Sequence, residues 1–109
     1  MSNKYSFGRP SLMKAIEPNE KATLKFLDTP KLVETEWGQK YKISILLLTH
    51  PSYPNISSKG IKMDWQTNAG VIKDIVALID EGNKEFLVDY KEHTWEVSVA
   101  EDGSYWVNG

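Results

Sequence analysis

The sequence contains no cysteine, which excludes a disulfide framework and every thiolate metal site. It has only two histidines, His50 and His93, and neither has a metal-ligating partner at a useful spacing. We therefore expect no metal centre and no cofactor. The longest apolar run, residues 45–48, has the length of a strand and falls far short of the ~20 residues that a membrane span needs. No signal-peptide-like stretch opens the chain. These absences predict a soluble cytoplasmic protein that does not enter a membrane.

Motifs that would fix a catalytic activity are also missing. The sequence has no nucleophile elbow of the Gly-x-Ser-x-Gly type and no glycine-rich phosphate loop followed by Lys and Ser or Thr. The carboxylates between residues 80 and 102 are spread over several expected elements, so nothing pairs two of them for acid–base work. We expect that the protein is not an enzyme, since an active site would have to be shared between subunits.

Charge is distributed unevenly along the 109 residues, although the net charge is only −2. Residues 1–62 hold ten basic and five acidic side chains, whereas residues 63–109 hold three basic and ten acidic ones. This asymmetry indicates a surface with a basic side and an acidic side. The alternative is that a small protein scatters its charges unevenly by chance, because sequence halves are not surface faces until the fold is known.

Alternation of apolar and polar residues predicts short strands through most of the chain. The clearest alternation places Tyr41, Ile43, Ile45 and Leu47 on one face, with Lys40, Lys42 and Ser44 on the other. Residues 1–20 have little periodicity and are expected to form an N-terminal arm with one short turn near residues 12–16. A long loop is expected over residues 50–60. The expected strands cover about residues 21–29, 40–48, 61–66, 86–90, 95–99 and 105–107.

One helix is predicted, over residues 68–81. Apolar residues recur there at spacings of three and four, and Gly82 ends the pattern at a position where a left-handed backbone costs little. The resulting order is three strands, one helix, two strands and a short terminal strand. One helix cannot cover both faces of a flat five-stranded sheet, whereas a closed or nearly closed barrel needs no such cover. We therefore expect a mostly β, five-stranded Greek-key barrel of the OB-fold type over residues 21–109, with its helix between strands three and four.

Three stretches resemble single-stranded-nucleic-acid-binding OB-folds. Residues 17–26 and 36–45 are similar to the first hairpin of that family, and residues 63–68 running into 72–79 are similar to its strand-to-helix junction, as found in archaeal, phage and viral members. The resemblance covers about residues 17–100. It implies that the chain binds single-stranded DNA or RNA largely without sequence preference, during replication, recombination or repair. Such proteins stack bases on aromatic side chains along a cationic groove.

Aromatic residues outside the core pattern are the candidates for base stacking. Trp37 precedes Gly38 in an expected turn, and no periodic core pattern includes it. Tyr53 lies between prolines in the 50–60 loop and either stacks on a base or anchors the loop. Tyr41 follows the core register but stands near a strand end, so we expect it at the barrel mouth. Trp106 alternates with Tyr105, so one of the two faces outward.

Four lysines are the candidates for phosphate contacts, because they fall on outward faces or in the long loop: Lys40, Lys42, Lys59 and Lys62. The alternative is an ordinary solvated face. Two further tryptophans, Trp65 and Trp95, share the parity of apolar neighbours and are expected in the core.

Other partners remain open at this stage. The acidic second half of the chain favours an alternative in which the barrel is a protein-interaction module for a basic partner, with no nucleic-acid binding. The last expected hairpin leaves an edge through which a homodimer could pair, and a replication protein is a further candidate partner. Residue types do not separate DNA from RNA, since that depends on contacts to the 2′-hydroxyl.

Overall fold

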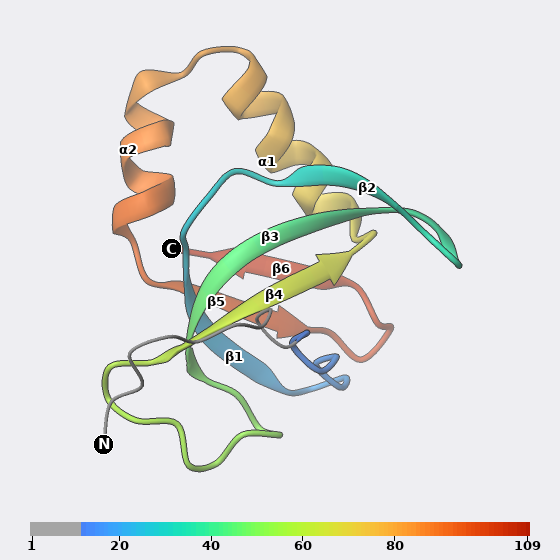
Figure 1. Ribbon diagram of the computed structural model, residues 1–109, viewed down its shortest axis with the longest axis vertical. Helices are drawn as coiled ribbons and strands as arrows, with labels where there is room; N and C mark the ends of the chain where they lie inside the picture. Colours follow the sequence, from blue (N-terminus) through green and yellow to red (C-terminus); the bar gives the residue numbers. More distant parts are fainter. Residues whose placement is uncertain (1–11) are drawn as a thin grey trace, which may run out of the picture.

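The computed structural model describes residues 12–109 of the chain (Figure 1). Over that range the chain is mostly β, with six strands and two α-helices. In chain order these are β1 (Lys21–Phe26), β2 (Lys31–Thr35), β3 (Gly38–Thr49), β4 (Ile61–Thr67), α1 (Gly70–Asp80), α2 (Lys84–Glu92), β5 (Trp95–Val99) and β6 (Tyr105–Asn108).

All strand pairings in the described chain are antiparallel, and β3 is the strand that joins most of them. The first part of β3 pairs with β2 and its last part pairs with β1 on the same edge, while β4 runs along the other edge. Beyond β1 the order continues to β5 and β6. Within residues 12–109 no ladder joins β4 to β6, so the six-stranded sheet is curled but not closed.

β1 and β2 lie along the same edge of β3, separated by a break at residues 27–30. The Leu27 N–H donates to the Ser44 carbonyl at 2.8 Å, and the Ser44 N–H donates to the Asp28 carboxylate at the same distance. Pro30 has no N–H to give to a ladder. The predicted strand over residues 21–29 therefore ends at Phe26, and a second strand that the sequence analysis did not predict begins at Lys31.

The strand predicted over residues 86–90 is wrong, because this stretch lies within helix α2. The side chain of Asn83 accepts a hydrogen bond from the Phe86 N–H at 3.0 Å and caps the helix. Phe86 and Tyr90 stand four residues apart and both pack on the core, which is a helical spacing. Val88, which would share their face in a strand, is 53% exposed. The predicted single helix is consequently corrected to two, whereas α1 confirms the helix expected over 68–81.

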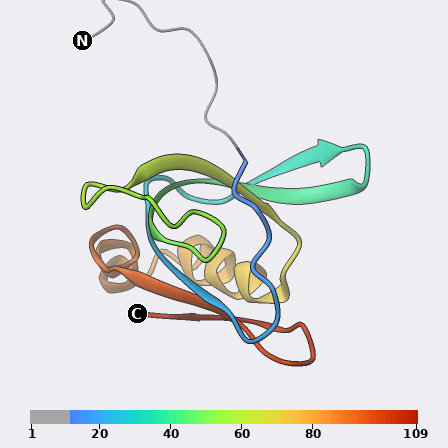
Figure 2. The same cartoon turned by 90° about the horizontal axis from the view of Figure 1, so that it is seen from below.

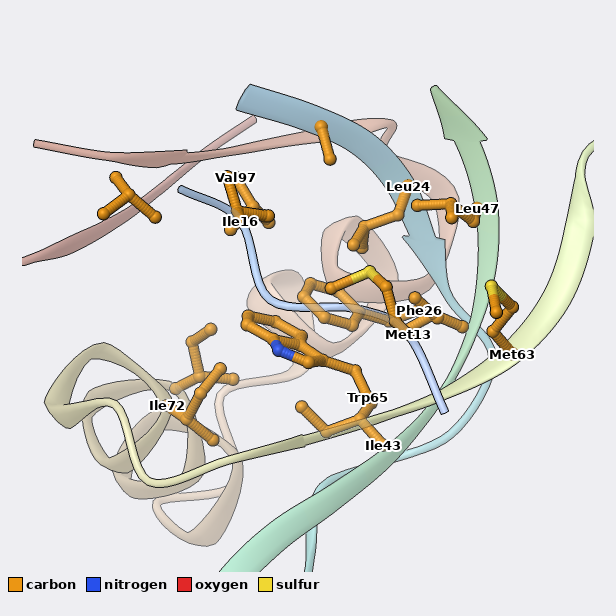
Figure 3. Close-up of a cluster of buried hydrophobic side chains, with 14 of the residues drawn as sticks. Met13, Ile16, Leu24, Phe26, Ile43, Leu47, Met63, Trp65, Ile72 and Val97 are labelled. Atoms are coloured by element: carbon orange, nitrogen blue, oxygen red, sulfur yellow. The ribbon is translucent and has the colours of Figure 1, made fainter. Parts of the chain in front are cut away.

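The core lies between the inner faces of the strands and the two helices (Figure 3). Its centre contains Trp65, 3% exposed, with Ile72 of α1 beside it, so the expectation that Trp65 is a core residue is confirmed. Phe26 and Tyr90 stack face to face at 4.5 Å, which fixes α2 on β1. The buried apolar residues are Met13, Ile16, Ala22, Leu24, Phe26, Ile43, Ile45, Leu47, Met63, Trp65, Ile72, Ile75, Tyr90, Val97 and Val99.

Residues 12–20 cross from β4 to the start of β1 (Figure 2). The Met13 N–H donates to the Asp64 carbonyl of β4 at 2.8 Å, and Met13 and Ile16 are buried in the core. The described part of the expected N-terminal arm is thus packed on the curled sheet, and residues 1–11 lie outside the described part. Seen from below in Figure 2, this segment spans the side where β4 and β6 do not pair, and α1 is visible between the strands.

Tyr90 supports the fold through its hydroxyl as well as its ring, and this generates a prediction. The hydroxyl donates to the Asp28 carbonyl at 2.8 Å, and burial, with the nearby Asp28 charge, raises the pKa of Tyr90. We expect Tyr90→Phe to lower the free energy of unfolding by about 1 kcal/mol at pH 7, because the phenyl ring keeps the stack but leaves the carbonyl without its donor. Chemical denaturation would measure this.

The same variant tests the raised pKa of Tyr90. The unfolded chain loses the tyrosine proton near pH 10, where the folded protein still holds it. The contribution of Tyr90 to the free energy of unfolding is therefore fully present below about pH 10 and is lost as the pH rises above that value. We expect the Tm of the wild type to fall more steeply than that of Tyr90→Phe between about pH 9.5 and 11. Parallel pH profiles would contradict this assignment.

Candidate nucleic-acid interface

Alternate residues of three adjacent strands form one solvent-facing surface, which we call the outer face. The outer face is the surface of β2, β3 and β4 that points away from the core. Its residues are neighbours because of how the three strands pair. Lys31 and Gln66 flank Lys42 on its two sides, Val33 pairs with Lys40, and Leu46 pairs with Lys62. The members of the outer face are Lys31, Val33, Lys40, Lys42, Ser44, Leu46, Lys62, Asp64 and Gln66.

Four of these nine side chains are lysines, and one is a carboxylate. Lys40, Lys42 and Lys62, which the sequence analysis proposed for phosphate contacts, share this surface because odd-numbered residues of β3 face the core and even-numbered ones face away. Lys31 joins them from β2. Lys59, the fourth proposed lysine, is exposed in the 50–60 loop and is not part of the outer face.

An ion pair lies in the middle of the outer face. Lys42 Nζ is 3.5 Å from Asp64 Oδ2, with the Lys42 side chain 44% exposed and the Asp64 side chain 10% exposed. Ser44 pairs directly with Asp64 across the ladder, so the two charged side chains meet on a diagonal. This pair places a donor and an acceptor next to each other on a surface that otherwise carries positive charge.

The centre of the outer face is hollowed. The hollow has a volume of about 330 Å³, and the break at 27–30 contributes one wall to it. We call it the outer hollow. Its lining residues are Asp28, Lys31, Val33, Lys42, Ser44 and Asp64. A small group can therefore reach the Lys42–Asp64 pair from solvent.

Trp37 stands at the tip of the β2–β3 hairpin and is 82% exposed. The Thr35 hydroxyl donates to the Gly38 carbonyl at 2.7 Å and accepts from the Trp37 N–H at 3.1 Å, which fixes the turn. Gly38 has a φ of +100°, a conformation that favours glycine. The tip projects beyond the other strands in both Figure 1 and Figure 2. The indole is thus presented to solvent on an ordered backbone.

Tyr41 does not join the outer face. It pairs with Leu32 and Thr67 on the opposite side of the hairpin and is half-buried against the core. There it lines a second hollow together with Asn68 and Lys73 at the start of α1. Lys40 of the outer face lines the same hollow, so this hollow is shared between Tyr41 and one of the proposed phosphate-contacting lysines.

Tyr53 anchors the long loop. Its hydroxyl accepts from the Lys14 N–H at 3.2 Å, and its ring stands edge-on to His50 at 5.0 Å. His50 in turn bonds the Lys14 carbonyl through Nε2 at 2.9 Å. Of the two roles left open for Tyr53, the structure supports the anchor. The loop leaves β3 after Thr49, roughly 36 Å along the strand from the hairpin tip, so Tyr53 and Trp37 lie at opposite ends of β3.

Trp106 is the outward member of the pair in β6. It is 58% exposed, whereas Tyr105 is half-buried and packs near Trp65 at a centroid distance of 6.2 Å. Burial raises the pKa of Tyr105. Trp106 pairs across to Ser98 of β5, so the structure does not bring it into the outer face of β2, β3 and β4. Trp95 is partly buried against the core as expected, and its indole N–H donates to the Tyr90 carbonyl at 3.0 Å.

Among residues 12–109 no three His, Cys, Asp or Glu side chains gather closely enough to hold a metal ion. The pKa of the Asp102 carboxyl is lowered, because the Ser104 hydroxyl and N–H bond the charged form in an exposed turn. No helix within these residues is long and apolar enough to cross a membrane.

No protein-family model, no curated protein sequence and no solved structure matches this chain. Function must therefore be argued from the outer face and from Trp37.

Two charged outer-face residues, Lys31 and Asp64, were not among the site residues that the sequence predicted. Lys31 lies on a strand that was not predicted, although Lys31, Val33 and Thr35 alternate with other residues and two of them are β-branched. Asp64 alternates with the core residues Met63 and Trp65, which places it on the outward side of β4. Its proximity to Lys42 depends on the β3–β4 register, which no single stretch of sequence carries.

The anchor role of Tyr53 generates a prediction. We expect Tyr53→Ala to lower the free energy of unfolding by about 1 to 3 kcal/mol, because it removes the ring from His50 and the acceptor from the Lys14 N–H. Thermal denaturation measures the loss. Pro54→Ala, an exposed neighbour in the same loop, is the control and should change the Tm little. A Tyr53→Ala protein as stable as the wild type would remove the anchor role.

Proposed function

We propose that this protein binds single-stranded nucleic acid, DNA in the first instance, largely without sequence preference. Trp37 stacks on a base, and the outer-face lysines neutralise phosphates. The observation that carries the proposal is the 82% exposed Trp37 on a fixed hairpin tip, directly connected to the strands that hold Lys31, Lys40 and Lys42. Aromatic platforms beside a cationic surface are the general means of binding single strands.

The strand pairing supports an OB-type layout. Counting β1 and β2 as one bent strand leaves five, with α1 between the third and fourth of them. The pairing of β1 with both β3 and β5 agrees with a Greek-key barrel that is left open between β4 and β6. In OB-folds the second and third strands form the oligonucleotide face. Those strands correspond to β3 and β4, which carry most of the outer face.

Charge along the chain supports the same surface. The lysine-rich first part of the chain contributes β2 and β3, while helix α2 carries Glu85, Asp89 and Glu92 on the other side of β1. The phosphates of a single-stranded nucleic acid are attracted to the lysines of β2 and β3 and repelled by the carboxylates of α2. This arrangement suits a role in protecting or presenting single strands during replication, recombination or repair.

The first test is the affinity of Trp37→Ala for a labelled oligo-dT, measured by fluorescence anisotropy at low salt. Loss of one stacked base costs about 1–3 kcal/mol, so we expect Kd to rise about 5- to 150-fold. The Tm should stay within about 1 °C of the wild type, because the ring makes no core contact. Trp37→Phe should restore most of the affinity.

Two outcomes would count against this role of Trp37. Unchanged affinity in Trp37→Ala would remove the stacking platform, and a large fall in Tm would make the ring structural. Absence of binding by the wild type at low salt would end the single-strand proposal, because that condition favours it most. A stoichiometric, nuclease-insensitive protein partner would then support the interaction-module alternative.

The lysines are tested by the dependence of log Kd on log salt. Each phosphate contact on a single strand contributes about 0.7 to the slope, so Lys40→Gln and Lys62→Gln should each lower it by about that amount. Lys84→Gln on α2 changes the charge equally at a distance from the outer face and serves as the matched control. Equal slopes for all three variants would show that the outer face does not contact phosphates.

A further inference from the structure

We propose that the outer hollow is a subsite for a single base and that the Lys42–Asp64 pair makes it prefer guanine. This inference rests on the proposed function and adds a local preference to binding that is otherwise insensitive to sequence. It starts from the position of Asp64, a carboxylate in the middle of a lysine-bearing surface. A carboxylate at that point repels a phosphate, whereas the pair together offers a donor and an acceptor to a neutral ligand.

The charges of the outer hollow fit a base better than a phosphate. Asp28 and Asp64 both line it, so a phosphate placed there would meet two carboxylates. Asp28 is already engaged, because it accepts the Ser44 N–H at 2.8 Å. The Asp64 carboxylate has Lys42 as its only polar partner among the described residues, at 3.5 Å.

Asp64 therefore has unused acceptor capacity at a nearly buried position. A carboxylate offers two oxygens with about four acceptor sites, and one oxygen is near Lys42 Nζ. The side chain is 10% exposed and lines the outer hollow, so a ligand that fills the hollow displaces the water around the carboxylate. Donors on a ligand would be favourable there, because hydrogen bonds to a charged group are strong where solvent is scarce.

Guanine presents the matching pattern on its Watson–Crick edge. Its O6 accepts, and its N1–H and N2–H groups donate side by side. Lys42 Nζ can donate to O6, while the two oxygens of Asp64 accept from N1–H and N2–H. Proteins that recognise single strands use this edge because it is free of a pairing partner. Val33 supplies an apolar part of the wall against which the ring can lie.

The other bases match the pair less well. Adenine and cytosine each offer one amino donor beside a ring acceptor, which leaves one Asp64 oxygen unused. Thymine offers a single N3–H between two carbonyl oxygens, so one of them faces the Asp64 carboxylate. The expected order of affinity at this position is therefore guanine first, adenine and cytosine next, and thymine last.

The test uses oligo-dT of fixed length in which one central thymine is replaced by G, A, C or hypoxanthine, the base that lacks the N2 amino group. Binding to the wild-type protein is measured by anisotropy at one salt concentration. A bidentate base contact corresponds to a preference of about 5- to 150-fold, and we expect the G oligonucleotide to exceed all-T by a factor in that range. Hypoxanthine should fall between the two.

Asp64→Asn identifies the side chain responsible. This variant keeps the shape of Asp64 but replaces one acceptor oxygen with a donor, so the G preference should fall to less than about 2-fold, while affinity for all-T stays the same or rises as a negative charge is lost. Asp74→Asn on α1 makes the same charge change away from the outer face, and it should retain the preference. The Tm of both variants is compared with that of the wild type.

The outcomes separate this inference from the proposed function. Equal affinity of the wild type for all five oligonucleotides would overturn the guanine subsite and leave single-strand binding intact. A G preference that survives in Asp64→Asn would also overturn it. Failure of every oligonucleotide to bind would instead refute the proposed function. If Asp64→Asn does not fold, the comparison of guanine, hypoxanthine and thymine on the wild type still decides the question.

Discussion

The pairing of β3 on both of its edges is the constraint on which the rest of the structure depends. This 12-residue strand holds β4 on one edge and β2 followed by β1 on the other. The change of partner requires the break at residues 27–30, where Asp28 bonds the Ser44 N–H in place of a ladder partner. Since Tyr90 of α2 bonds the carbonyl of the same Asp28, the break also fixes where the second helix sits.

Strict alternation in β3 links the core to the candidate site. Ile43, Ile45 and Leu47 are fully buried, so their neighbours Lys42, Ser44 and Leu46 must face the other way. A slip of one residue in register would bury lysines, which costs far more than the loss of a few hydrogen bonds. The hydrophobic effect that closes the core therefore also fixes the positions of the outer-face charges. The same logic leaves Trp37 outside, because a two-residue turn beyond the last pair has no core to enter.

Sequence patterns predicted much of this arrangement and failed where the same spacing of apolar residues fits both a strand and a helix. The alternation around Ile43 and the parity of Trp65 were correct, because burial on one face of a strand leaves a period of two in the sequence. Phe86 and Tyr90 also fit that period, but their spacing of four fits a helix equally well, and the Asn83 cap with packing on Phe26 decided for the helix. β2 was missed because none of its residues is buried, and its one leucine, Leu32, is 55% exposed, so the strand leaves no alternating apolar pattern in the sequence.

The sequence by itself determined the buried faces of β3, β4 and α1, the position of the basic half of the chain and the place of one tryptophan in a turn, since these are properties of single residues and near neighbours. Only the tertiary structure decided that the sheet stays open between β4 and β6, that residues 12–16 pack beside that opening, and that Tyr53 is an anchor. It also decided that Lys42 meets Asp64. These features join residues that are distant in the chain. Their geometry follows from strand register and packing between two segments, so the sequence of either segment alone does not specify it.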